Sequence, residues 1–357
     1  MDIGFWFTRV ERGTILADKL HALGNTVTLY HNLSIPTGTY QKKRVSYTFV
    51  NGMRELFKSN HDAYFTTGLL LPALQLTIYK WFKKVPFVLG VGAPYWRTYN
   101  SNHEFLTKWI MHRIIYPSLF KLIMHNAAHI ITNSIYLERL MGARYPTFDF
   151  KIQNIYNGVN YEIFKSSINR SKIRINKSIN FITVGTANFK AKTDGLMFLI
   201  NTIAKYIETV PDSRFTLAIK SVNIEEQTRL AEAIPINMAN RIILKFNCDS
   251  ISQLIDESDI FIYSTPEDSS DSLPRVLIEA QAMGIPTITT KAVGCEEVII
   301  QNETGLVTKY DQGEILGAIH FIVDNPLDAL DMAQKGKQHV KKVFNWDSMA
   351  NKYQGLF

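Results

Sequence analysis

The sequence predicts an α/β protein built of two Rossmann-like, doubly wound domains. A chain of 357 residues is long enough for two domains that each bury a core. Its hydrophobic fraction of 46% and charged fraction of 20% are typical of a globular protein. Short apolar runs alternate with helical patterns along both halves, and this alternation predicts parallel sheets covered by helices.

The first half has a strand and helix pattern of this kind. We expect buried strands at residues 2–6, 27–30, 63–66, 87–91 and 129–132. After the first strand, a turn containing Gly13 leads into a helical pattern through Leu16 and Leu20 that stops at Gly24.

The second half repeats the pattern. We expect strands at residues 181–184, 214–219, 242–246, 260–263 and 287–289, and a helix around 195–209. A second helix, Leu273 to Met283, is ended by Gly284-Ile285-Pro286. Between the halves, the polar and basic stretch from Ser166 to Ser178 has no apolar period. We therefore place the domains at 1–165 and 166–342.

The composition limits the classes of partner that the chain could bind and the cellular compartment that we expect for it. The net charge of +7 suits anionic partners such as a nucleotide diphosphate or a phospholipid surface, and no zinc-finger or RNP pattern favours nucleic acid. The two cysteines, Cys248 and Cys295, form no CxxC motif, so no metal site is predicted. No apolar run is long enough to cross a bilayer and no secretory signal is readable, which predicts a cytoplasmic protein.

Two carboxylates eight residues apart, Asp271 and Glu279, carry the strongest functional signal. Between them, Ser272, Leu273 and Pro274 form a loop that opens a helix, where backbone N–H groups and the helix dipole can hold a diphosphate. Glu279 can accept hydrogen bonds from ribose hydroxyls and Asp271 from sugar hydroxyls. The alternative is that Asp271 is a loop cap and Glu279 part of a solvated helix face.

In these residues the chain resembles the retaining glycosyltransferases of family 4, the glycosyltransferases group 1, which carry a Glu, seven residues, Glu signature. Asp271 stands at the place of the first Glu, and the match continues through Ala280, Ala282, Gly284, Pro286, Val293-Gly294 and Glu297. The resemblance implies the GT-B fold, with two Rossmann-like domains facing a central cleft. It also implies that the final helix, within 343–357, returns to the first domain.

The donor side includes a second segment, Thr183 to Gly195. Its strand ends on Gly185, and Lys190 and Lys192 stand just before a helix, where the resemblance implies that they meet the diphosphate. Thr186 occupies the place of the family's arginine. Ordinary surface lysines are the alternative.

The first half is, by the same resemblance, the acceptor-binding domain. Gly13 in the loop after the first strand would let backbone approach a phosphate or sugar, and a plain turn glycine is the alternative. The family's N-domain histidine has no counterpart, because that place reads Val91-Gly92-Ala93-Pro94; His103 lies nearby in a polar loop.

The activity implied is transfer of a hexose-type sugar with retention, from a nucleotide diphosphate sugar to a glycan or lipid-linked acceptor. Asp271, Glu279 and Lys192 are the catalytic candidates. No Asp-x-Asp motif is present, and neither a metal nor another cofactor is implied. A catalytically silent nucleotide-sugar-binding protein and a GT-B sugar-nucleotide epimerase are the alternatives. The base, sugar and acceptor depend on loops near Asn247, Tyr95 and Trp96.

Aromatic and basic residues alternate in Tyr79-Lys80-Trp81-Phe82-Lys83-Lys84 and recur between Phe105 and Ala127. Such mixtures are typical of segments that lie on a membrane interface. After Pro117, the residues Ser118, Lys121 and His125 share one helical face. This favours peripheral contact with anionic lipid; helices that only cover the first sheet are the alternative.

Overall fold

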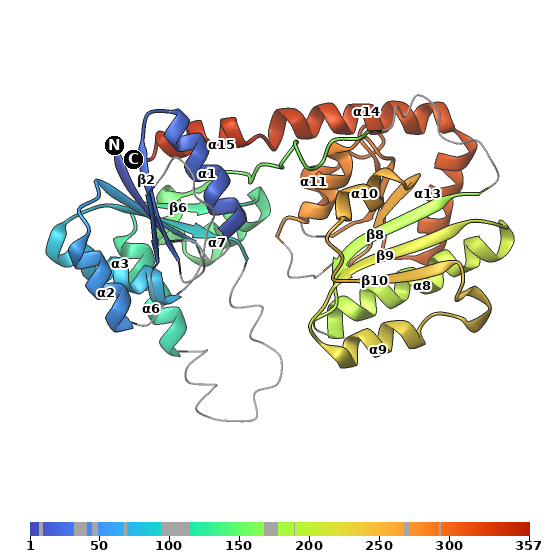
Figure 1. The fold of residues 1–357 in the computed structure, drawn as a ribbon, viewed down its shortest axis with the longest axis horizontal. Helices are drawn as coiled ribbons and strands as arrows, with labels where there is room; N and C mark the ends of the chain where they lie inside the picture. The colour runs from blue at the N-terminus through green and yellow to red at the C-terminus, as the bar shows by residue number, and fades with distance from the viewer. Residues whose placement is uncertain are drawn as a thin grey trace. The chain divides into compact units, whose positions relative to one another are not determined.

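The computed structural model describes residues 1–6, 10–31, 41–44, 49–67, 70–93, 114–167, 178–188, 190–267, 272–292 and 294–357. The chain divides into two compact units. Unit 1 comprises Met1–Gly158 together with Asn345–Phe357, and unit 2 comprises Val159–Phe344. Each unit is a parallel sheet covered by helices (Figure 1), which confirms the predicted α/β fold class.

Unit 1 has a seven-stranded sheet in the order β3-β2-β1-β4-β5-β6-β7, and every strand pair is parallel. Its strands are β1 (Asp2–Trp6), β2 (Thr26–His31), β3 (Gln41–Arg44), β4 (Ala63–Thr67), β5 (Phe87–Val91), β6 (His129–Thr132) and β7 (Ile152–Asn154). The strand order reverses between β1 and β4. The five strands predicted for this half are present.

Helices cover both faces of this sheet. They are α1 (Val10–Ala22), α2 (Phe49–Lys58), α3 (Leu70–Lys83), α6 (Tyr116–Asn126), α7 (Ile135–Arg144), the short 3₁₀ helix η2 (Pro146–Lys151) and α15 (Trp346–Gln354). One core cluster joins the sheet to α1 and α15, and the other joins it to α2, α3, α6 and α7. Residues 1–158 thus need the last helix to cover one face of their sheet.

Unit 2 has a six-stranded parallel sheet in the order β10-β9-β8-β11-β12-β13. Its strands are β8 (Asn180–Thr186), β9 (Arg214–Lys220), β10 (Ile242–Phe246), β11 (Ile260–Tyr263), β12 (Thr287–Thr290) and β13 (Leu306–Thr308). The order reverses between β8 and β11. In open α/β sheets, ligands bind outside the carboxyl ends of the strands at such a reversal.

The helices of unit 2 also lie on both faces. They are α8 (Lys190–Thr209), α9 (Ile224–Glu232), α10 (Ile251–Asp256), α11 (Arg275–Ala282), α12 (Cys295–Val298), α13 (Gln312–Asp324) and α14 (Pro326–Val343), with the short 3₁₀ helix η3 (Ile236–Met238). Along β11, Ile260 and Ile262 join the core under α8 and α13, while the buried Phe261 and Tyr263 alternate to the other face. As predicted, α11 ends just before Gly284, whose φ of 67° favours glycine.

Three strands were not predicted from the sequence. β3 reads Gln-Lys-Lys-Arg and so has no apolar run, while β7 and β13 are only three residues long. All three lie at or next to a sheet edge, where only one neighbouring strand is needed to hold them. Short or polar edge strands are therefore invisible to a search for apolar alternation.

The division between the units falls earlier than the predicted boundary at 165/166. Ser166 and Ser167 bind the Asp256 carboxylate of α10, with Ser167 N donating to Oδ2 at 3.0 Å. The Val159 amide donates to the Phe344 carbonyl at 3.0 Å. Side-chain and backbone bonds of this kind attach Val159–Ser167 to unit 2, although the segment has no apolar period that the sequence could have revealed.

No helix in the described ranges is long and apolar enough to span a bilayer.

Replacing Tyr353 of α15 by Ala should destabilise unit 1. Tyr353 is 4% exposed, and its ring centroid lies 5.0 Å from that of Phe65 on β4 in an edge-to-face arrangement. We expect the variant to lose about 3–5 kcal/mol in free energy of unfolding, measured by urea denaturation. Tyr353→Phe keeps the ring and should lose much less. Equal stability of the Ala variant and the unchanged chain would contradict a packing role for α15.

Candidate active site

The site in unit 2 begins where the strand order reverses. The loops after β8 and β11 leave the sheet in opposite directions there, and α8 follows the first of them. Gly195 of α8 lies so close to the end of β11 that a Cβ built on it would be 3.5 Å from the Ser264 carbonyl oxygen. The first turns of α8 therefore pack beside the carboxyl end of β11.

The ends of β11 and β12 are joined by two hydrogen bonds. The Thr265 amide donates to Thr290 Oγ1 at 3.0 Å, and Thr290 Oγ1 donates to the Thr265 carbonyl at 2.8 Å. Both threonines are buried. The Thr290 side chain thus connects the backbone after β11 to the end of β12 and stabilises the carboxyl edge of the sheet.

Gly294 holds the loop that leads into α11. Its φ is 75°, and a Cβ built on it would lie 2.2 Å from the Ser272 carbonyl oxygen and 2.9 Å from Leu273 Cα. Only glycine satisfies both the backbone conformation and this close approach. The resemblance to family 4 included Gly294 by sequence alone, and the structure supplies the physical reason for it.

Glu279 is buried in this arrangement. It is the fifth residue of α11 and is 8% exposed, and Arg275 Nη2 donates to its Oε1 at 3.1 Å. A buried carboxylate is tolerated only where hydrogen bonds and opposite charge offset its desolvation. The alternative of a solvated helix face is therefore wrong for Glu279. Asp271 lies outside the described residues.

The loop between the two acids is likewise buried. Ser272 and Leu273 are 3% and 7% exposed, and Pro274 is the N-cap residue of α11. Among the residues that the structure describes, none caps the start of this helix with its side chain. The first N–H groups of α11 therefore follow a loop whose position Gly294 determines; that they hold a diphosphate stays a prediction.

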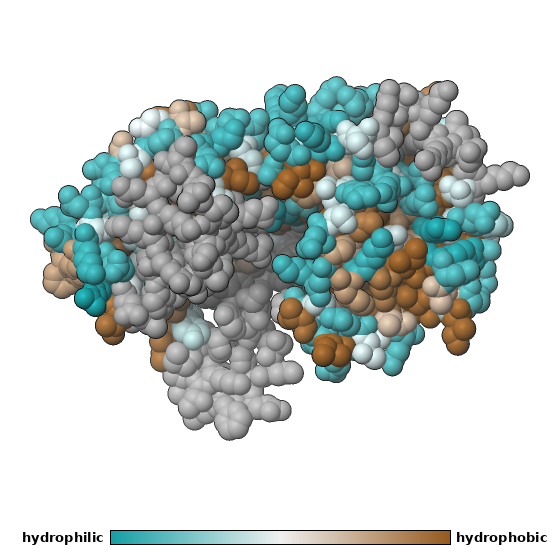
Figure 2. All heavy atoms as spheres, viewed as in Figure 1, coloured by the Kyte–Doolittle hydropathy of each residue, from teal (hydrophilic) through white to brown (hydrophobic). Residues whose placement is uncertain are grey.

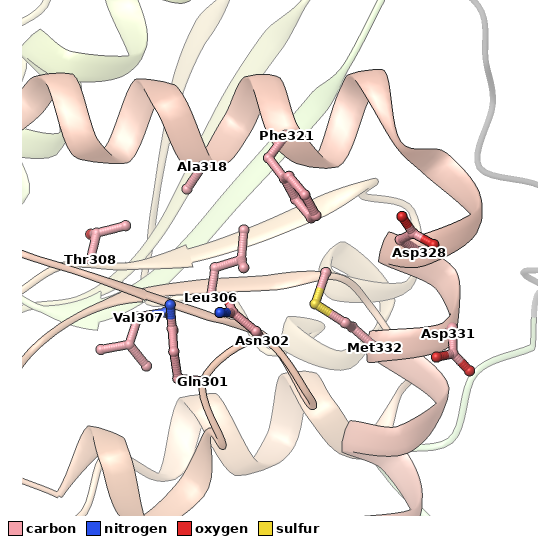
Figure 3. Close-up of a pocket in the computed structure, with 10 residues that line it drawn as sticks. All are labelled: Gln301, Asn302, Leu306, Val307, Thr308, Ala318, Phe321, Asp328, Asp331 and Met332. Atoms are coloured by element: carbon pink, nitrogen blue, oxygen red, sulfur yellow. The ribbon is translucent and has the colours of Figure 1, made fainter.

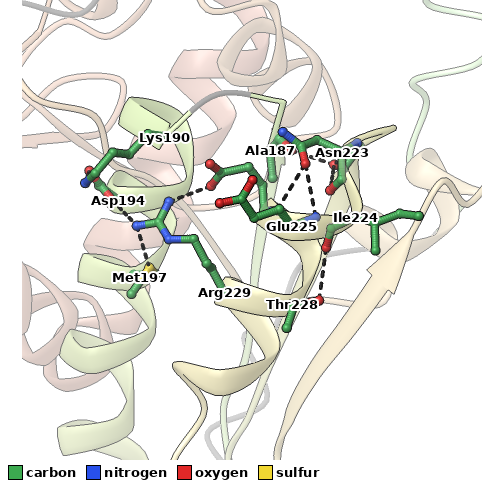
Figure 4. Close-up of polar contacts among 11 residues, drawn as sticks. Ala187, Lys190, Asp194, Met197, Asn223, Ile224, Glu225, Thr228 and Arg229 are labelled. Carbon is green, nitrogen blue, oxygen red and sulfur yellow. Dashed lines mark hydrogen bonds and ion pairs between the residues drawn. The ribbon is translucent and has the colours of Figure 1, made fainter.

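The helix α8 begins at Lys190, so Lys190 and Lys192 belong to its first turn, and the prediction that they stand just before a helix is wrong. Lys190 pairs within this helix. Its Nζ lies 2.7 Å from Asp194 Oδ2, and the side chain is 75% exposed. Arg229 of α9 reaches the other oxygen of Asp194 at 2.6 Å and also binds Glu226 at 2.6 Å (Figure 4). The hydrogen bond from Lys190, followed by that from Arg229, holds the pKa of the Asp194 carboxyl below its usual value.

This network distinguishes the two lysines. The Asp194 carboxylate pairs with the Lys190 ammonium through one oxygen and with the Arg229 guanidinium through the other. It therefore links α8 to α9 and holds the Lys190 side chain along α8. Lys192 is half-buried one turn before Gly195, the residue that packs beside Ser264. Gly185 lies on β8, next to its last residue, as predicted. That either lysine contacts a diphosphate stays a prediction.

One polar group at this edge was not singled out from the sequence. Ser264 is 9% exposed at the carboxyl end of β11, and its hydroxyl oxygen has no hydrogen-bond partner within the described part of the chain. A buried hydroxyl without a partner is costly unless a ligand or water satisfies it. Its position directly after a buried strand of a doubly wound domain is the signal that could have identified it.

Asn247, expected near the base-recognition loop, has a structural role. Its side chain accepts from the Ser221 amide at 3.0 Å and donates to the Ser221 carbonyl at 2.8 Å, which extends the pairing of β9 and β10 beyond their ends. Nearby, Val222 and Ile224 are 85% and 78% exposed. Apolar side chains reach the visible surface of unit 2 over β9, β10 and the start of α9 (Figure 2).

In unit 1, Gly13 does not lie in the loop after β1. The helix α1 begins at Val10, so Gly13 is a buried helical residue, and the predicted turn position is wrong. Gly92 and Ala93 are exposed after β5, while Tyr95, Trp96 and His103 lie outside the described residues.

A cavity of about 550 Å³ lies elsewhere in unit 2, beside the edge strand β13 (Figure 3). Gln301 and Asn302 line it just before that strand, Phe321 lines it from the second half of α13, and Asp328 and Asp331 from the start of α14. Its lining residues come from β13, the segment before it, α13 and α14, and none belongs to the loops after β8 or β11. Two acids would also repel an anionic ligand.

Gly294→Ala should destabilise unit 2 strongly. The substitution combines a strained φ with overlap against the Ser272 carbonyl, so we expect a loss of about 2–4 kcal/mol in free energy of unfolding. Gly317→Ala is the matched control, because Gly317 is an exposed residue of α13 with nothing within 4 Å of an added Cβ. It should gain about 0.5–1 kcal/mol. Similar urea midpoints for both variants would refute the contact.

Sequence comparison places this site in a known family domain. Residues 178–325 match the family model described as "Glycosyl transferases group 1". The capsular polysaccharide biosynthesis glycosyltransferase CapM of Staphylococcus aureus is 24% identical over 204 residues, which are 55% of this chain and 52% of CapM. The chain spans about half the length of the curated relatives it matches.

Solved structures share the fold of the whole chain. Sucrose-phosphate synthase from Thermosynechococcus elongatus superposes with a TM-score of 0.79 at 16% identity, covering 100% of this chain and 98% of that one. Anabaena HepE in complex with UDP gives a TM-score of 0.73 at 15% identity and covers 99% of both chains. Residues 178–325 are thus similar to the group 1 glycosyltransferase domain, within a chain that shares the GT-B fold of these structures.

Proposed function

We propose that this chain transfers a hexose-type sugar from a nucleotide diphosphate sugar to a glycan or lipid-linked acceptor, with retention at the anomeric carbon. One observation carries the proposal: the buried Glu279 carboxylate lies behind the Ser272–Pro274 loop, at the carboxyl edge where the strand order of a group 1 domain reverses. Nucleotide ligands bind at this place in doubly wound sheets.

Each part of the edge has a proposed role. Glu279 accepts hydrogen bonds from the ribose hydroxyls, and Arg275 holds its carboxylate in place at 3.1 Å. The N–H groups at the start of α11 and the Lys192 ammonium face the diphosphate. The Ser264 hydroxyl supplies a further polar contact to the donor. Asp271 holds a sugar hydroxyl.

The reaction exchanges one C–O bond for another. The bond between the anomeric carbon and the β-phosphate oxygen breaks, and the acceptor oxygen bonds to the carbon on the face that the phosphate leaves. The acceptor's proton passes to the departing diphosphate. Negative charge grows on that diphosphate as the bond breaks, so fixed N–H dipoles and Lys192 lower the barrier by stabilising it.

The proposed reaction needs no metal ion. We therefore expect turnover to be undiminished in excess EDTA.

Uridine diphosphate is the first nucleotide to test. The structures of Anabaena HepE, which share the fold, contain UDP, UDP with glucose, or UDP-glucose. CapM is named for capsular polysaccharide biosynthesis, which suits a glycan acceptor. A nucleotide at 100 times its dissociation constant would raise the apparent stability by about 2.7 kcal/mol, enough for a thermal-shift panel to find the donor.

Glu279→Gln should remove most of the transfer activity while the fold remains. The amide keeps the side chain's size but loses the charge that Arg275 and the ribose hydroxyls contact, so we expect a fall of about 100-fold or more in kcat/KM, or about 3 kcal/mol. Glu232→Gln, an exposed residue at the end of α9, is the control and should leave turnover unchanged. Near-normal turnover by Glu279→Gln would make the assignment wrong.

UDP binding without turnover by the unaltered chain would favour a silent nucleotide-sugar-binding protein.

Lys192→Ala should weaken binding of UDP more than binding of uridine, because its proposed partner is the diphosphate. Calorimetry with both ligands measures this difference, which we expect to be about 10-fold. Lys190→Ala should have a smaller effect, since Asp194 holds that ammonium. Lys205→Ala, further along α8, is the control for a general loss of charge. Equal losses for uridine and UDP would contradict the role of Lys192.

A further inference from the structure

Exposed aromatic side chains gather at one end of unit 1. Among the Phe and Trp residues whose side chains the structure describes, five are exposed, and four of these precede strands of the first sheet: Phe57, Trp81, Phe82 and Phe150, at 44%, 55%, 69% and 82%. They stand at the ends of α2, α3 and η2, which lead into β4, β5 and β7. Because these strands are parallel, all four lie at the amino edge of the sheet.

Ring contacts join the first part of this group. The Phe57 and Phe82 centroids are 5.8 Å apart, and Phe57 also meets the buried Tyr79 at 5.4 Å. The helices α2 and α3 that carry them lie side by side (Figure 1). The two exposed rings thus rest on a rigid base, so little conformational freedom would be lost when a partner covers them.

The second part is attached through α6 and η2. Lys80 Nζ and Trp81 Nε1 donate to the backbone and side chain of Asn126, at 2.6 and 3.0 Å. Lys151 Nζ donates to the Ala127 carbonyl at 2.9 Å and lies over the Phe150 ring. We name the set of exposed residues at this end of the sheet, Phe57, Trp81, Phe82, Lys83, Lys84 and Phe150, the aromatic-basic edge.

Lys84 carries a conformational cost at this edge. It follows α3 with a φ of 59°, the left-handed conformation in which helices usually end on glycine. A lysine in this conformation is less stable than glycine would be. Lys83 and Lys84 are both exposed and directly follow Phe82 in sequence, and a contact outside the chain would explain a lysine here.

We propose that the aromatic-basic edge docks on an anionic phospholipid surface. Aromatic rings that stand out from the protein can enter the headgroup region, and lysines next to them are attracted to anionic lipid. Of the neighbouring acids, Glu55 is paired with Lys58, whereas Asp62 accepts from the Asp2 amide and keeps its negative charge beside the lysines. A lipid surface fits better than a protein groove because the exposed groups come from three separate helix ends.

The structure changes the membrane face predicted from the sequence. Lys80 is half-buried and bonded to Asn126, so it is not part of the surface, whereas Phe57 and Phe150 are added from segments far away in sequence. Ser118, Lys121 and His125 of α6 are exposed, as predicted for that helical face. Residues 94–113 lie outside the described part of the chain.

The position of this edge has a consequence for the acceptor. The helix α3, with 14 residues, runs from the carboxyl edge of β4 to the amino edge of β5, a distance of about 21 Å. A membrane bound at the amino edge would therefore lie about 20 Å from the carboxyl edge of the same sheet. This part rests on the proposed function: the acceptor would be a lipid-linked glycan that reaches over that distance, and not a sugar next to the headgroup.

Co-sedimentation with vesicles tests the docking surface without any donor. Vesicles of 30% phosphatidylglycerol in phosphatidylcholine should bind the chain in 20 mM salt, while pure phosphatidylcholine or 300 mM salt should reduce binding. Lys84→Gly should weaken binding about 5-fold, and its thermal stability should be equal or higher because glycine prefers this φ. Phe82→Ser should weaken binding about 10-fold.

Two control variants separate a local effect from a general one. Lys352→Gly in α15 removes an exposed lysine from another part of unit 1, and Ile236→Ser removes a side chain that is 96% exposed in unit 2. Both should bind vesicles like the unchanged chain. UDP binding in solution should be the same for all variants. No binding to anionic vesicles, or equal losses in edge and control variants, would overturn the docking surface while leaving the proposed function intact; loss of UDP binding by the unchanged chain would do the reverse.

Discussion

The contact between the Gly294 backbone and the Ser272 carbonyl is the constraint on which the donor side depends. It packs the segment after β12 directly against the loop before α11, so the positions of these two parts of the carboxyl edge depend on each other. The Thr265–Thr290 hydrogen bonds stabilise the same edge between β11 and β12. With the backbone held in this way, the start of α11 and the Glu279 carboxylate are presented in a fixed relation to each other.

Some of the charged side chains at this edge stabilise the packing of the protein, and others are proposed to bind the ligand. Asp194 receives both Lys190 and Arg229, so these two cations are engaged in the packing of α8 against α9. Arg275 is engaged with Glu279. In the proposed function, backbone N–H groups at the start of α11 and the Lys192 ammonium contact the diphosphate. The preorganised N–H groups need no rearrangement when the sugar bond breaks.

The two edges of a parallel sheet offer different surfaces. At the carboxyl edge, loops of varied length follow the strands and can form a ligand site, whereas the amino edge receives the ends of the preceding helices. In unit 1 those helix ends carry Phe57, Phe82 and Lys84. Docking at the amino edge would leave the loops at the carboxyl edge of the same sheet clear of the lipid.

The sequence by itself determined the features that depend on local patterns. Apolar runs and their turn residues predicted ten of the strands and the end of α11 at Gly284, because a buried parallel strand must be apolar and a helix end favours a left-handed glycine. The spacing of Glu279 behind the Ser272–Pro274 loop was also readable, since both belong to one helix and the loop directly before it. The short polar strand β3 was not, because only its neighbour β2 gives it strand conformation.

The tertiary structure decided everything that depends on residues brought together from distant segments. That Gly294 meets Ser272, that Lys190 is drawn to Asp194 beside Arg229, and that Lys80 turns inward to Asn126 all follow from packing between elements. Gly13 shows the same limit, because a glycine suits a turn or a buried helix position equally until the start of the helix is known. Local sequence specifies which conformations are favourable, but side-chain partners are chosen only when the sheets and helices pack.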